Sequence, residues 1–190
     1  MKKIIKNNPE ILISIVLNIL YIITGSILMT FPALGMVEPI YFISIIFFIF
    51  SFLNIAAYFM AKKNIDYELL FMALLNLLIG TFLFIMQYEE ESFILGTFVL
   101  AYTIGTLLIK GYYTEILKRK NNNMWKVKFV TLFLLGLIGL LTSINLYNEM
   151  SVYTIMFAYY FITFGIINLF EPISKYLTQS GYIKIIKRKN

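Results

Sequence analysis

Cysteine and histidine are both absent from this chain of 190 residues. Without cysteine there is no disulfide, no thiolate nucleophile and no cysteine-ligated metal site. Without histidine the chain lacks the commonest metal ligand and the commonest general base. The sequence also shows no glycine-rich phosphate loop and no paired-carboxylate site. We therefore predict no catalytic, metal-binding or cofactor-binding residues, and we do not expect an enzyme.

Charged residues are also few, and long apolar stretches separate them. Charged residues make up 14% of the chain and apolar residues 60%, with a mean hydropathy of +0.82. A helix needs roughly 20 apolar residues to cross a membrane. Six uncharged stretches have about this length, at 11–31, 39–61, 69–87, 92–109, 129–146 and 151–170. The fold class predicted is an all-α integral membrane protein with six transmembrane helices.

Positive charge is missing from three of the loops, and this asymmetry sets the orientation. The basic residues precede span one or follow spans two, four and six: Lys2, Lys3, Lys6, Lys62, Lys63, Lys110, Lys118, Arg119, Lys120, Lys126, Lys128, Lys175, Lys184, Lys187, Arg188 and Lys189. The other three loops carry Glu38, the run Glu89 to Glu91, and Glu149. Because basic loops stay on the cytoplasmic side, both termini are predicted there, in the bacterial inner membrane.

Glycines recur at matching depths, which predicts three helical hairpins. Gly25, Gly80 and Gly139 lie in the odd-numbered spans, and Asn54, Gly105 and Gly165 lie in the even-numbered ones. The hairpins cover residues 11–61, 69–109 and 129–170, followed by a basic tail at 171–190. Each would enter and leave on the same face, so the repeats are parallel, unlike the inverted repeats of many transporters.

The first hairpin carries the fullest motif, Gly25-Ser26-Ile27-Leu28-Met29-Thr30-Phe31-Pro32. This pattern resembles the HdeD-like acid-resistance membrane protein family. The resemblance implies six helices built from repeated helical pairs, with such a motif at each outer turn, and a role in acid or envelope stress. In the second and third hairpins Gln87 and Leu146 stand where the family tends to have proline.

Two functions from different classes remain open. The first is a non-enzymatic HdeD-like membrane protein whose partners are lipid and either a second copy of itself or another membrane protein. The alternative is the substrate-binding membrane subunit of an energy-coupled importer, or another small transporter, which would show an outward-facing polar pocket.

No nucleic-acid partner is expected, since neither basic segment is long enough to form a folded basic face. Glu89, Glu90 and Glu91 are candidate pH-responsive residues, because adjacent carboxylates repel one another.

Overall fold

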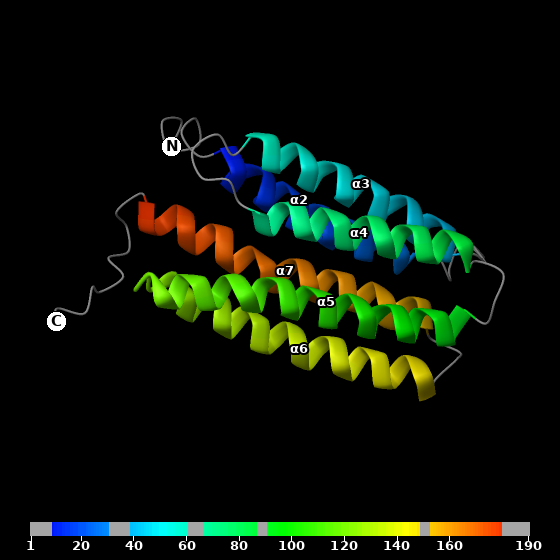
Figure 1. The fold of residues 1–190 in the computed structure, drawn as a ribbon. Helices are drawn as coiled ribbons and strands as arrows, with labels where there is room; N and C mark the ends of the chain where they lie inside the picture. The colour runs from blue at the N-terminus through cyan, green and yellow to red at the C-terminus, as the bar shows by residue number, and fades with distance from the viewer. Residues whose placement is uncertain (1–8, 31–38, 61–66, 87–90, 149–152, 180–190) are drawn as a thin grey trace.

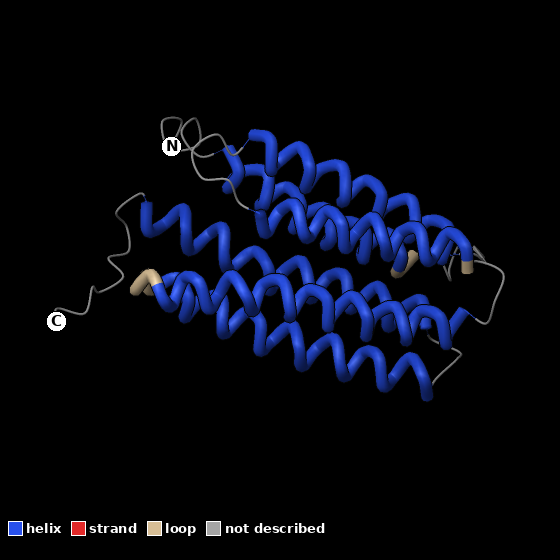
Figure 2. Tube along the Cα trace, in the orientation of Figure 1, coloured by secondary structure: helices blue, strands red, loops and turns tan. Residues whose placement is uncertain are grey.

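Six helices make up the computed structural model, which describes residues 9–30, 39–60, 67–86, 91–148 and 153–179 (Figures 1 and 2). They are α2 (Pro9–Leu28), α3 (Pro39–Met60), α4 (Tyr67–Ile85), α5 (Glu91–Arg119), α6 (Met124–Asn148) and α7 (Tyr153–Gln179). No strand occurs within those ranges. Each helix is long and apolar enough to cross a membrane. The prediction of an all-helical chain with six apolar helices is confirmed.

The helices form a closed ring in which each helix packs against the next and α7 packs against α2. The closest pairs are α2 with α7, α3 with α4, and α5 with α6. Helices within a predicted hairpin, such as α2 and α3, have less contact with each other than with their other neighbours. The first helix begins and the last helix ends at the same end of the bundle (Figure 1). We call this the basic end, because all the described Lys and Arg residues lie toward it.

The three glycines of the odd-numbered spans share one packing role. Gly25 of α2 lies against α7, Gly80 of α4 against α3, and Gly139 of α6 against α5. A Cβ on Gly25 would lie 2.6 Å from the Ala158 carbonyl oxygen, so only glycine lets these backbones approach. Close approach of this kind is the main source of helix association in lipid. The aligned glycines therefore mark the three tightest interfaces of the ring.

Small hydroxyl side chains reinforce two of these interfaces, α3 with α4 and α5 with α6. Ser44 Oγ of α3 donates to the Gly80 carbonyl at 2.8 Å, and Ser51 Oγ donates to the Ala73 carbonyl at 2.8 Å. Ser143 Oγ of α6 donates to the Gly96 carbonyl of α5 at 3.0 Å. Each bond satisfies a hydroxyl that would otherwise be unpaired in hydrocarbon.

Large apolar side chains cover the outer faces of the helices. Phe52, Phe59 and Leu108 are 70%, 74% and 69% exposed. Such side chains would be an aggregation hazard in water, but they are the expected surface of a protein surrounded by acyl chains. The inside of the ring is filled instead by aromatic rings, described below.

Three helices run past the predicted ends of their spans at the basic end. α5 continues beyond residue 109 to Arg119, α6 begins at Met124 ahead of residue 129, and α7 continues beyond residue 170 to Gln179. Residues 171–179, the first part of the predicted basic tail, are thus a continuation of α7. A charge at the edge of an apolar run does not terminate a helix when its side chain finds a partner.

The turn between α5 and α6 is correspondingly short. Asn121 has a φ of 51°, and the Asn122 amide donates to the Leu117 carbonyl at 3.0 Å. This is the left-handed closure that ends many helices, and asparagine tolerates it better than most residues. The Asn122 Oδ1 atom then accepts from the Met124 amide at 3.1 Å, so one residue closes α5 and starts α6.

Candidate functional site

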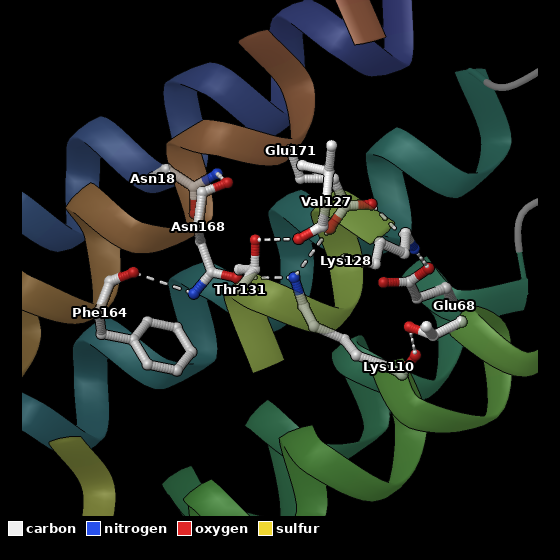
Figure 3. Close-up of polar contacts among 10 residues, drawn as sticks. Asn18, Glu68, Lys110, Val127, Lys128, Thr131, Phe164, Asn168 and Glu171 are labelled. Atoms are coloured by element: carbon white, nitrogen blue, oxygen red, sulfur yellow. Dashed lines mark hydrogen bonds and ion pairs between the residues drawn. The ribbon is translucent and has the colours of Figure 1, made fainter. Parts of the chain in front are cut away.

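Four charged side chains from four helices meet inside the basic end of the ring (Figure 3). Lys128 of α6 lies between two carboxylates: its Nζ atom pairs with Glu68 of α4 and lies 2.8 Å from Glu171 Oε1 of α7. Lys110 of α5 has its Nζ atom 3.3 Å from Glu171 Oε2. We call these four residues the charge cluster.

The charge cluster is largely shielded from solvent. The exposed fractions of its side chains are 9% for Lys128, 11% for Glu68, 13% for Lys110 and 19% for Glu171. Two ammonium groups and two carboxylates leave no net charge, which lowers the cost of placing them near hydrocarbon. Removing one member of a buried pair is costly for the same reason. The charge cluster therefore joins α4, α5, α6 and α7 at one depth.

Asn168 connects the charge cluster to the first helix. Its Oδ1 atom accepts from Lys110 Nζ at 2.6 Å, and its Nδ2 atom donates to the Phe164 carbonyl at 2.9 Å. Pro172 lies four residues later inside α7 and has no N–H to donate to the Asn168 carbonyl. Asn18 Nδ2 of α2 donates to that carbonyl instead, at 3.3 Å. The proline thus leaves a backbone acceptor free for a bond between α7 and α2.

A polar cavity of about 110 Å³ lies beside the charge cluster. A cavity of this size holds several waters or one small polar solute. Amide, carboxylate and ammonium groups line part of it, together with the Tyr21 side chain. Its lining residues are Ile11, Ser14, Leu17, Asn18, Tyr21, Asn54, Glu68, Leu69, Met72, Lys110, Phe164, Asn168, Glu171, Pro172 and Lys175.

Hydrogen-bonded hydroxyls continue from the cavity toward the middle of the bundle. The Tyr21 and Tyr102 hydroxyls lie 2.7 Å apart, and Thr103 Oγ1 lies 3.1 Å from the Tyr160 hydroxyl. Beside them Asn76 of α4 and Thr106 of α5 are fully buried, yet neither side chain makes a hydrogen bond of normal geometry with another described residue.

Aromatic rings close the centre of the ring of helices. Phe47, Phe98, Phe157 and Phe161 are each no more than 1% exposed. The Phe47 ring contacts Phe98 edge-on at 5.2 Å between centroids and Phe161 at 5.7 Å. The polar cavity lies at the basic end of the ring, next to the charge cluster.

The residues predicted from the sequence fall mostly in helix interfaces and not in this site. Gly165 packs against Asn18 and Ile22 of α2, and Gly105 packs against Leu75 of α4. Asn54 is the exception, because it lines the cavity while donating to the Phe50 carbonyl at 2.8 Å. Pro32, Glu89 and Glu90 lie outside the described residues, and Glu91 is the first residue of α5.

Sequence reasoning missed the charge cluster because each member lies at or just beyond the edge of an uncharged stretch. Such residues are read as loop charges in contact with water. A usable signal was present: Glu68 and Lys128, like Lys110 and Glu171, are opposite charges that adjoin spans at the same predicted depth. No group of three or more acidic side chains suited to a metal ion occurs among the described residues.

Comparison with known proteins identifies a family repeat in the first part of the chain. The model of the family described as "Short repeat of unknown function (DUF308)" matches residues 16–85, which run from within α2 to the end of α4. No curated protein and no solved structure matches the chain. The chain thus carries, over residues 16–85, the repeat of the family to which HdeD-like membrane proteins belong, which confirms the resemblance given by the Gly25 to Pro32 motif.

Proposed function

We propose that this protein is a non-enzymatic, HdeD-like protein of the bacterial cytoplasmic membrane that supports survival under acid or envelope stress. The observation that carries the proposal is the family repeat over residues 16–85. The site adds support, because its charges are engaged in pairing with one another and the centre of the bundle is filled by aromatic rings. Such an interior suits a protein that acts through packing with lipid or other proteins.

The proposed orientation places the basic end in the cytoplasm. The described basic residues all lie in the halves of α5, α6 and α7 nearest that end or in the turn between α5 and α6: Lys110, Lys118, Arg119, Lys120, Lys126, Lys128 and Lys175. Loops rich in Lys and Arg resist translocation, so this end and both termini are assigned to the cell interior. The three repeats then have their turns outside, where Glu89, Glu90 and Glu91 would meet external acid first.

Survival of a deletion strain tests the stress role. Cells lacking the gene are exposed to acid and, separately, to a membrane-active detergent, and viable counts are compared with the parent strain. We expect lower survival after one or both treatments, restored by the wild-type gene. Equal survival of deletion and parent strains in both treatments would refute the proposed role.

A second strain separates the outer carboxylates from the rest of the protein. A gene with Glu89, Glu90 and Glu91 all replaced by Gln keeps the helices and removes the proposed acid-responsive charges. If these residues respond to acid, this gene restores detergent resistance but not acid survival. Full restoration of acid survival would remove the three glutamates from the mechanism.

A further inference from the structure

A groove of about 890 Å³ runs along the outer surface between α5 and α6. It lies on the lipid-facing side, away from the charge cluster, and exposed residues such as Phe133 and Leu137 form its walls. Gly111 leaves it open, since a Cβ at that position would meet nothing within 4 Å. The lining residues are Leu107, Gly111, Thr114, Glu115, Lys118, Trp125, Lys126, Phe129, Leu132, Phe133, Gly136, Leu137 and Leu140.

The lining of the groove changes from basic and aromatic at one end to apolar at the other. Lys118, Trp125 and Lys126 lie at its basic end, where the Lys118 Nζ atom is 5.4 Å from the centroid of the Trp125 ring. From Phe129 to Leu140 the α6 wall is almost entirely apolar. Tryptophan and lysine favour the headgroup zone of a bilayer, whereas phenylalanine and leucine favour the acyl chains. The groove therefore has the polarity profile of one phospholipid.

The two lysines are available to an anionic ligand. Among the residues that the structure describes, neither Lys118 nor Lys126 forms an ion pair. Glu115, the one acidic residue of the lining, already binds Arg119 at 2.6 Å. The basic end of the groove thus carries positive charge that no described carboxylate neutralises.

The length of the groove matches one leaflet. Along α6, Lys126 and Leu140 are separated by about 21 Å of helix rise, and along α5 Leu107 and Lys118 by about 16 Å. Half of a hydrocarbon core of about 30 Å is about 15 Å. The parts of α5 before Leu107 and of α6 after Leu140 contribute nothing to the lining.

We propose that this groove binds one anionic phospholipid, with its phosphate between Lys118 and Lys126 and an acyl chain along Phe129, Phe133 and Leu137. A helix of a second copy is a poorer fit, because a crossing helix would use the full span and would bring no phosphate to the lysines. The assignment to the inner leaflet rests on the proposed orientation, but binding itself does not.

Native mass spectrometry of the detergent-solubilised full chain tests the proposal. The protein is titrated with phosphatidylglycerol and, in parallel, with phosphatidylcholine of the same acyl chains. Each lysine near a membrane surface contributes about 5-fold to binding of anionic lipid. We expect tighter binding of phosphatidylglycerol, and a loss of about 5-fold in each of the variants Lys118→Gln and Lys126→Gln.

Two further variants separate this site from general charge attraction. Lys120→Gln removes an exposed cation outside the groove and should leave the preference for phosphatidylglycerol unchanged. Gly111→Leu fills the open space without altering charge and should weaken binding of both lipids. Glycerol phosphate, which lacks acyl chains, should not displace bound phosphatidylglycerol.

Three outcomes would overturn the proposal. The first is equal affinity for the two lipids, and the second is a loss in Lys120→Gln as large as that in Lys118→Gln. The third is a stable dimer that Gly111→Leu dissociates while lipid binding stays the same, which would assign the groove to a second copy. None of these results bears on stress survival, so the proposed function is tested separately.

Discussion

Lys128 offers the sharpest test of the charge cluster. Its Nζ atom forms ion pairs with both Glu68 and Glu171, and its side chain is 9% exposed. In the variant Lys128→Met a side chain of similar length preserves most of the packing but removes the ammonium group. The carboxylates then keep their charge while losing their shared partner. Breaking a buried ion pair in this way costs about 3–5 kcal/mol.

The position of Lys128 favours the lower part of that range. It lies four residues into α6, about 6 Å of helix rise from Met124, and Glu68 is the second residue of α4. Side chains this close to a helix end can partly reach the headgroup zone and its water, which relieves an unpaired charge. We therefore expect a loss of about 3 kcal/mol in the free energy of unfolding.

The assay is a titration of the protein in mixed micelles with sodium dodecyl sulfate, followed by helical circular dichroism. Lys126→Met is the matched control, because Lys126 is exposed on the same helix and should change stability by no more than about 0.5 kcal/mol. Adding Glu68→Gln to Lys128→Met should recover part of the loss, with a coupling of at least about 1 kcal/mol. Unchanged stability in Lys128→Met, or strict additivity in the double variant, would refute the reasoning.

Three other predictions concern packing, polar satisfaction and orientation. Gly25→Ala should destabilise the bundle, since its Cβ would lie 2.6 Å from a backbone oxygen, whereas Gly111→Ala should be neutral or stabilise by up to about 1 kcal/mol; the same titration compares them. Thr103→Val should cost about 1 kcal/mol because it breaks the bond to Tyr160, while Thr106→Val removes a hydroxyl that makes no hydrogen bond of normal geometry and should cost less. An equal loss in both variants would show that Thr106 is bonded to Tyr102. In this cysteine-free chain, Thr30→Cys should react with an impermeant maleimide in intact cells and Lys120→Cys only after lysis; the reverse pattern would invert the proposed orientation.

The sequence allowed good prediction of features that depend on hydropathy and poor prediction of those that depend on neighbours. The six spans follow from uncharged runs, because burying a charge in lipid is costly. Gly25, Gly80 and Gly139 were predicted as equivalent positions, but which helix each one contacts depends on how the ring closes. The arrangement of the chain as three parallel repeats stays a prediction.

The charge cluster could not be predicted from the sequence for a similar reason. A lone lysine such as Lys110, next to an apolar run, has the same local sequence whether it faces water or a carboxylate. Only the approach of α7 to α5, two helices separated by α6 in the chain, decides between these outcomes. The groove between α5 and α6 could not be predicted from the sequence either, because its apolar wall residues would face lipid whether or not a groove were present.

The contact between α2 and α7 has a consequence for synthesis. Asn18 and Asn168, which join these helices, are 150 residues apart in the chain. At a translation rate of roughly 5–20 residues per second, α2 waits on the order of ten seconds for its main partner to emerge. During that interval the surface around Gly25 is uncovered in the bilayer, so the nascent chain is open to wrong helix partners or insertion factors until its last segment arrives.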